Sequence, residues 1–499
     1  MRQSGFRLPW RAPLPESSAA RRRARVLRVA AYVVLSAALI VPVVQFQLLV
    51  ARQAGEDPSA AEAGALRGAI NRWRPAIRAY WAGENIYLPV PGPGAGPEDR
   101  NASGTYLHPN MPLTVVFLSP FAYIPPLTAT LLYNLLKTAV AVASLLMLAD
   151  VVRHGERRVP DWVVALGFLF GVRFIIGDIQ HGNTNVFVLG GVACHLWLYR
   201  RGRDLLAGLP LAAAICLKLT PALFVLYWLH QRNWKLAGAT LAALVLLAIV
   251  VPVLASGPEA YAERAGTWLD ALILPAVVEN QWYPEHINQS LPGMAARLFL
   301  DGRDGDIYWS PDSDPHYRKG PRDWITLVSL PERAVQMIVR AGQLIVLGLM
   351  AWAIGRRRLA RDDGRRSLHY AMIVLAMTLL NQRTWDHHAT VVLVAGVAMW
   401  HAIGYGRMSS AARKWALGLA LAAGALTWCI GNDLFKLAAD LAGRPEEVGD
   451  FWADLFSAYG STFWVFVLLF AACVICGVAT RKHEPPYAPE RQKLDTQPE

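Results

Sequence analysis

Long apolar runs recur along the whole chain, separated by short segments rich in Arg, Pro or Trp. Most runs approach the roughly 20 residues that a helix needs to cross the hydrocarbon core of a bilayer. The pattern predicts an all-α polytopic membrane protein of about twelve helices, some short or re-entrant, with no conventional soluble domain. The predicted helices lie within residues 30–50, 113–150, 162–176, 186–199, 205–229, 236–254, 335–354, 368–380, 390–403, 417–430 and 462–480.

The arginines set the predicted orientation, because positive residues beside short loops tend to stay in the cytoplasm. Several arginines precede the first run, which is too long for a signal-peptide core, so we expect an uncleaved first helix with a cytoplasmic N-terminus. Arg200 and the block from Arg356 to Arg366 mark later cytoplasmic loops. The first loop, residues 51–112, and the large loop, residues 256–334, are then predicted to lie outside.

Two segments are predicted to enter the membrane without crossing it. Leu113–Ile124 is too short to span and is followed by Pro125 and Pro126, so it is predicted to be an interfacial or re-entrant helix. Leu205–Leu229 has basic residues at both ends, which a single crossing does not allow. A hairpin of two short helices with its turn near Lys218 satisfies the rule. A lysine at membrane depth is a candidate for a functional role. Alternatively, the Lys218 side chain extends to the polar surface of the membrane and has no function.

The basic excess does not imply a nucleic-acid partner. The net charge is +12, but the basic residues lie at helix ends and form neither a basic face nor an RNA-binding motif. All five cysteines fall inside predicted apolar spans, where a disulfide framework or a zinc site is unusual. Cys473 and Cys476 give only a weak sign of redox chemistry, and packing is the simpler interpretation. We expect no metal and no cofactor.

The densest polar cluster is Asn381–His388, predicted to lie at the outer mouth between two helices. His387 and His388 can donate to a phosphate or relay protons near neutral pH. Arg383 can pair with an anion through two parallel hydrogen bonds. An interfacial polar turn that happens to contain Trp and His is the alternative.

Weaker polar groups are predicted on the same outer face. The turn Gln180–Asn185 offers amides that suit a helix cap or sugar hydroxyls. Trp282–Leu291 combines aromatic, amide and acidic side chains, which suit a carbohydrate or lipid headgroup but also a membrane-interface belt. The first loop adds Ala82–Tyr87 and His108–Asn110. Because the topology sends all these groups to one face, a single site is predicted there.

The order of these motifs resembles glycosyltransferase family 87. The motifs are Gly83-x-x-x-Tyr87, the turn at Gly182, Lys218-x-x-Pro221, Asn288-Gln289-Ser290-Leu291 and Trp385-Asp386-His387-His388. The resemblance covers residues 80–403. It implies a GT-C-type fold and an integral membrane enzyme that uses polyprenyl-phosphate mannose as donor.

The resemblance implies an inverting hexose transfer to a lipid or glycan acceptor among membrane lipids. The expected place is the extracytoplasmic face of a bacterial inner membrane. His387 and His388 are assigned to the leaving group, and Lys218, Arg297 and Arg383 to the donor phosphate. The residues assigned to substrate binding are Tyr87, His108, Asn183, Asn288, Gln289, Trp385 and Asp386.

One departure concerns the base that deprotonates the acceptor hydroxyl. Family members typically carry an acidic residue for this role in the first outer loop, upstream of Gly-x-x-x-Tyr. The matching stretch here, Ala69–Ala76, contains no carboxylate, and its Asn71 cannot act as a base. Glu84 is assigned as the catalytic base instead, with Asp57 and Glu62 as alternatives.

Two rival functions stay open at this point. A transporter or flippase for an amphiphile also places polar groups at membrane depth, but it predicts inverted repeats, and inspection of the sequence reveals none. A subunit that kept the enzyme fold and lost the base is the second rival.

The predicted organisation has four parts. They are a basic cytoplasmic N-terminus (1–29), a transmembrane catalytic region (30–404), C-terminal transmembrane helices (405–480) and a polar cytoplasmic tail (481–499). Both large outer loops belong to the catalytic region.

Overall fold

The computed structural model describes residues 18–57, 66–91, 103–153, 159–278, 281–300, 325–356, 358–429 and 432–481. These residues are mostly helical, and their one sheet is an antiparallel pair, β1 (Pro89–Pro91) with β2 (Ser103–Tyr106). Among them, seven helices are long and apolar enough to cross a membrane, or up to eight if one bent pair is a single span. The prediction of an all-α polytopic membrane protein is confirmed.

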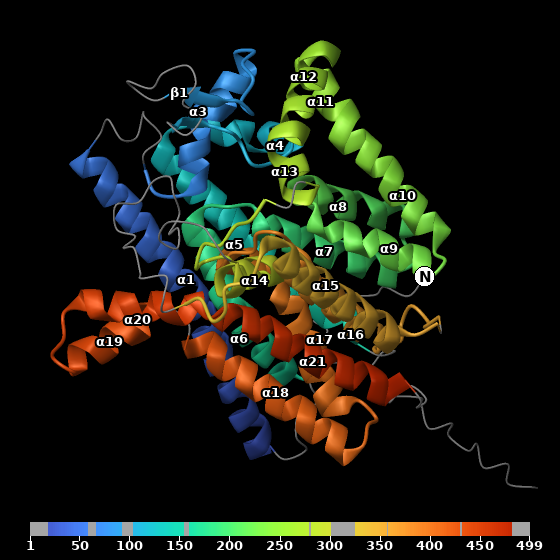
Figure 1. Ribbon diagram of the computed structural model, residues 1–499. Helices are drawn as coiled ribbons and strands as arrows, with labels where there is room; N and C mark the ends of the chain where they lie inside the picture. The colour runs from blue at the N-terminus through green and yellow to red at the C-terminus, as the bar shows by residue number, and fades with distance from the viewer. Residues whose placement is uncertain are drawn as a thin grey trace, which may run out of the picture.

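Each helix predicted from the apolar pattern has a counterpart in the bundle (Figure 1). The long spans are α1 (Ser18–Glu56), α5 (Pro126–Val151), α6 (Asp161–His181), α10 (Trp234–Val245) with η2 (Leu246–Val250) and α11 (Val251–Ser256), α15 (Glu332–Ile354), η5 (Asp386–Val391) with α17 (Val392–Tyr405), and α21 (Ser461–Arg481). The shorter helices are α4 (Pro112–Tyr123), α7 (Asn185–Arg200), α8 (Asp204–Leu217), η1 (Thr220–Ala222), α9 (Leu223–His230), α16 (Arg366–Leu380) and α18 (Ser410–Cys429).

The predicted hairpin with Lys218 at its tip is confirmed. Lys218 adopts an extended backbone after α8, and the chain then turns through η1 into α9. The first turn of α8 and the last turn of α9 meet at the buried His195 of α7. Its Nδ1 lies 2.8 Å from the Ala207 carbonyl oxygen, and its Nε2 accepts a hydrogen bond from Trp228 at 2.8 Å. The chain therefore emerges from the hairpin on the side where it entered.

Helices α6 and α17 approach too closely for side chains at their contact. A Cβ atom on Gly167 would lie 2.4 Å from Val397, and one on Gly171 would lie 2.8 Å from Leu393. Small residues four apart allow such approach in membrane helices, where van der Waals packing holds neighbours together. This contact sets the position of α6 relative to α17, and both helices carry polar motifs at their ends.

The first outer loop contains a helix that the hydrophobic pattern did not predict. This helix, α3 (Ala69–Trp81), packs against the end of α4. Arg74 donates to two carbonyl oxygens at the end of α4, and Arg78 donates to a third. The last carbonyls of a helix lack partners within it and favour nearby cations, so both arginines stabilise the end of this short helix.

Helices also occupy the large outer loop and the segment before the last span. They are α12 (Pro258–Trp268), η3 (Leu269–Ile273), α13 (Leu274–Val277), α14 (Leu291–Phe299), α19 (Asn432–Leu441) and α20 (Glu446–Ala458). Helices α19 and α20 form a pair that projects from the bundle (Figure 1). Asn85 of the first loop donates to Thr267 of α12 at 2.9 Å, so the two outer loops are joined.

Gly167→Val is expected to destabilise the protein, because the branched side chain cannot fit beside Val397 unless α6 and α17 separate. Overpacking of this kind costs about 1–3 kcal/mol. The thermal midpoint of the detergent-solubilised protein measures the effect. Gly238→Val on α10 is the matched control, because nothing lies within 4 Å of its Cβ position. Equal midpoints for the two variants would contradict the packing argument.

Candidate functional site

The carboxylate of Asp178 builds the turn between α6 and α7. It accepts hydrogen bonds from the backbone N–H groups of Asn185 at 3.3 Å and Val186 at 3.1 Å. These donors lack partners within α7, so Asp178 caps that helix. Gly182 makes the turn possible: its φ is 70°, and a Cβ atom there would lie 2.6 Å from the nitrogen of Ala69 in α3.

Lys137 of α5 neutralises Asp178 inside the bundle. The ammonium and carboxylate lie 2.7 Å apart, and both side chains are fully buried. Lys137 also donates to the backbone carbonyls of Asp178 at 2.5 Å and Asn183 at 2.8 Å, which occupies its three donors. Neither charged residue was predicted from the sequence to belong to the site. A lysine within a predicted apolar span was the available signal.

Asn185 links this ion pair to Lys218. The Asn185 amide donates to Asp178 at 2.8 Å, and its oxygen accepts from the Lys218 ammonium at 3.1 Å. Its orientation is fixed, because only the amide nitrogen can donate to the carboxylate. Lys137 is thus neutralised by a carboxylate, whereas Lys218 is held by a neutral amide oxygen.

A small pocket opens beside Lys218. Its lining residues are Asn185, Val188, Lys218, Thr220, Met377, Thr378, Asn381, Thr384, His388 and Val391. Asn185 at the start of α7 and Thr220 at the start of η1 both lie on its wall. The structure therefore brings the predicted Lys218 and His388 together.

His388 presents a hydrogen-bond donor beside this pocket. The backbone N–H of Trp385 donates to its Nδ1 at 3.1 Å, so the neutral ring carries its proton on Nε2. The Trp385 and His388 rings are stacked, with centroids 6.0 Å apart and an interplanar angle of 3°. His387 instead faces the Asn183 amide at 3.2 Å, and its ring centroid lies 4.0 Å from that of His181. His181 is a neighbour for which the sequence predicted no separate role.

Residues 285–290 of the large outer loop are fastened to the wall of the pocket. The Asn288 amide donates to the carbonyl oxygen of Gln382 at 3.0 Å and accepts from the N–H of Thr384 at 2.9 Å. Gln289 donates to the carbonyl oxygen of Ser457 in α20 at 2.9 Å. Asn288 and Gln289, both predicted to bind substrate, thus lie beside the pocket, and their side-chain amides form hydrogen bonds within the protein.

The two arginines predicted to bind the donor phosphate lie in different surroundings. Arg297 is buried and donates to several backbone carbonyls, Asn288 among them at 2.9 Å. Burial lowers the pKa of its guanidinium to about 9. Arg383 is partly exposed, lies 4.5 Å over the Trp385 ring and pairs with Glu285 at 2.6 Å. Arg383 therefore lies near the pocket, whereas Arg297 holds the outer loop together.

The predicted residues of the first outer loop form a separate cluster. Tyr87 is buried, and its hydroxyl donates to the Asn110 carbonyl at 2.9 Å. The His108 ring packs against Trp73 and Tyr87, and burial lowers its pKa to about 4. Glu84 is exposed after α3. Within the described residues, none of the hydrogen bonds joins this cluster to the His388 pocket.

The other predicted acidic residues are not part of the pocket lining. Asp386 begins η5 and interacts electrostatically with Arg173 of α6. Asp57 is exposed after α1, and Glu62 lies outside the described residues. Asn71, in the stretch without a carboxylate, is buried and donates to the Thr130 hydroxyl at 3.0 Å.

Comparison with known proteins identifies one family. A family model described as glycosyltransferase family 87 matches residues 106–381, which is more than half of the chain. The matched stretch contains the α6–α7 turn, Lys218 and the α16 wall of the pocket, and it ends before His387 and His388. The search of curated proteins found no match.

Asp178→Asn is expected to destabilise the protein, because it leaves the Lys137 charge buried without a carboxylate. Removing one partner of a buried ion pair costs about 3–5 kcal/mol. The measurement is the thermal midpoint in detergent. Asp150→Asn at the end of α5 is the control, since both of its partners, Arg153 and Arg201, are partly exposed and pairs with exposed partners contribute about 0–1 kcal/mol. An equal fall in both variants would contradict the role of the buried pair.

Proposed function

Because the chain belongs to glycosyltransferase family 87, we propose that it transfers mannose from a polyprenyl-phosphate donor to a lipid or glycan acceptor, with inversion. The family and the apolar spans make the protein a membrane glycosyltransferase. We propose, in addition, the donor, the class of acceptor and the roles of individual residues. The observation that supports them is the pocket that Lys218 and His388 both line.

The pocket suits the phosphate of a polyprenyl-phosphate sugar. Lys218 supplies a positive charge, His388 supplies a neutral donor, and the Thr220 side chain also lines the pocket. A leaving phosphate gains negative charge as its bond to the sugar breaks. Donors already in position, in a site with little water, stabilise that charge without having to reorganise.

In the proposed reaction, the acceptor oxygen attacks the anomeric carbon from the face opposite the phosphate. The new bond forms while the bond from that carbon to the phosphate oxygen breaks, so the configuration inverts. The electron pair leaves with polyprenyl phosphate, and the acceptor proton passes to a carboxylate. Trp385 and Asn183, beside the pocket, are proposed to hold the sugar through ring contact and hydrogen bonding.

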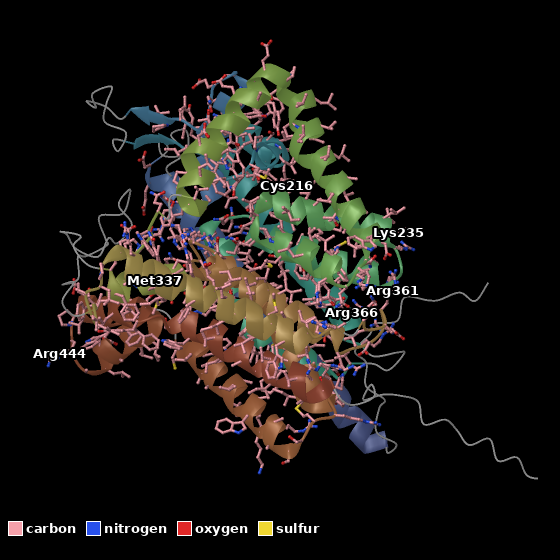
Figure 2. All side chains as sticks on the ribbon, turned by 45° about the vertical axis from the view of Figure 1, so that its right-hand side comes forward. Cys216, Lys235, Met337, Arg361, Arg366 and Arg444 are labelled. Atoms are coloured by element: carbon pink, nitrogen blue, oxygen red, sulfur yellow. The ribbon has the colours of Figure 1, made fainter. Side chains whose placement is uncertain are left out.

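The active face is proposed to point outward from a bacterial inner membrane. Helix α7 begins at Asn185 on the pocket wall and ends at Arg200; its 16 residues span about 24 Å. Arg361, Arg366 and Lys235 gather at one end of the molecule (Figure 2), and Arg361 donates to a carbonyl of the last turn of α7. Basic residues favour the cytoplasm, which supports an extracytoplasmic pocket.

Lys218→Met and His388→Ala are each expected to lower transfer about 100–1,000-fold, because each removes one donor from the leaving phosphate. The assay incubates purified protein with polyprenyl-phosphate mannose and membrane lipid extract, and mass spectrometry detects the hexose-shifted product. Lys235→Met and His230→Ala are matched controls, since both residues are exposed away from the pocket lining.

Two outcomes would count against the proposal. Near-normal transfer by folded Lys218→Met and His388→Ala variants would remove both residues from the leaving-group role. A wild-type protein that forms no product, but moves the donor lipid across proteoliposome membranes, would support a transporter instead.

Transfer is expected to proceed without a metal ion, because protein cations can stabilise a monophosphate leaving group. Among the described residues, no group of three or more His, Cys, Asp or Glu side chains is placed to hold a metal. Activity in excess chelator should therefore equal activity in untreated protein. Loss of activity in chelator that manganese restores would contradict this expectation.

A further inference from the structure

The carboxylates predicted or found around the site differ in what they are free to do. Asp178 is not free to accept a proton, because its oxygens already accept hydrogen bonds from Lys137 and from groups at the start of α7. Glu84 is exposed after α3, within the separate first-loop cluster. Glu285 lies on the outer-loop segment that is fastened to the pocket wall.

Glu285 is a buried carboxylate with one unused oxygen. Its side chain is only 6% exposed, and its Oε1 pairs with Nη2 of Arg383 at 2.6 Å. Its Oε2 is buried and has no hydrogen-bond partner among the described residues. Buried polar atoms almost always have a partner, and exceptions of this kind call for a functional explanation. A carboxylate oxygen without a hydrogen bond has a lone pair with which to accept a proton, as a base must.

A chain of contacts places Glu285 beside the donor pocket. The Arg383 guanidinium lies 4.5 Å over the Trp385 ring, and that ring is stacked on His388. On the other side, Asn288 of the same loop segment accepts from Thr384, a residue of the pocket lining. Two side chains, Arg383 and Trp385, therefore separate Glu285 from the proposed leaving-group donor.

We propose that Glu285 is the general base of this reaction, an inference that rests on the proposed function. The acceptor hydroxyl gives its proton to Oε2 of Glu285 while its oxygen forms the bond to the anomeric carbon. The bond from that carbon to the phosphate oxygen breaks, and the electron pair leaves with polyprenyl phosphate. Glu285 then releases the proton to water. Arg383 occupies Oε1 and leaves Oε2 for the acceptor.

The charges around Glu285 suit this role. Burial raises its pKa, and the neighbouring Arg383 and Arg297 oppose that rise. A raised pKa makes the carboxylate a stronger proton acceptor, and transfer should increase with pH as Glu285 loses its proton. The adjacent His286 lies 3.6 Å from Asp454, whose pKa is raised by burial to about 6. Ionisation of Asp454 could also make transfer increase with pH, so variants of Glu285 and of Asp454 must be compared.

The test compares variants in the transfer assay across a pH series. Glu285→Gln keeps the shape of the side chain but cannot accept a proton, so transfer should fall about 100–10,000-fold and the rising pH limb should disappear. Glu285→Asp should keep part of the rate and the limb. Asp454→Asn should retain near wild-type transfer and the same limb. Loss of the limb in Glu84→Gln, with the limb kept in Glu285→Gln, would overturn the assignment to Glu285.

Binding of polyprenyl phosphate and the thermal midpoint separate lost chemistry from lost structure. Glu285→Gln should bind polyprenyl phosphate as the wild type does, because Lys218 and His388 are unchanged. Wild-type transfer by Glu285→Gln, or a loss of transfer matched by a loss of binding, would overturn the role of Glu285 as the base and leave the proposed function intact. A wild-type protein that transfers no hexose would overturn the proposed function and this role with it.

Discussion

The buried ion pair between Lys137 and Asp178 is the interaction on which the site depends. Charges at membrane depth are costly unless they are paired, and these two lie 2.7 Å apart with no exposure. The same carboxylate caps α7 and orients the Asn185 amide, and that amide holds Lys218. One carboxylate therefore fixes the positions of α5, α6 and α7 and the tip of the α8–α9 hairpin.

Close packing and a broken helix complete the arrangement. The glycine contact between α6 and α17 accompanies the approach of Asn183 to His387 at the ends of those segments. The chain leaves the helical conformation at Lys218, which exposes backbone groups at membrane depth. Such a break is tolerated where the irregular backbone is buried in protein or lines a polar cavity. The pocket beside Lys218 meets that condition.

Local properties of the sequence predicted the spans and the hairpin, because hydrophobic length and charge asymmetry are visible in short windows. The partners of individual side chains are not visible in this way. Arg297 and Gln289 were predicted to bind substrate, yet their polar groups bond within the outer loop and α20. Lys137 did give a signal, as a lone lysine in an apolar run. Glu285 differs from Glu84 only in burial and contacts, which the folded chain alone reveals.

The charges of the network leave the pocket with an uncompensated lysine, which suits an anion. Lys137 and Asp178 cancel and Asn185 is neutral, so Lys218 contributes positive charge to a wall that also holds the start of η1. A bound phosphate would pair with the Lys218 ammonium and so offset the cost of burying its charge. The affinity for an anion then comes from the position in which the fold holds Lys218. In the proposed reaction, the phosphate charge grows as the sugar–phosphate bond breaks, so its interaction with Lys218 strengthens and the barrier falls. Arg383 and Trp385 stand between Glu285 and this wall, so the base and the leaving-group cation do not neutralise each other.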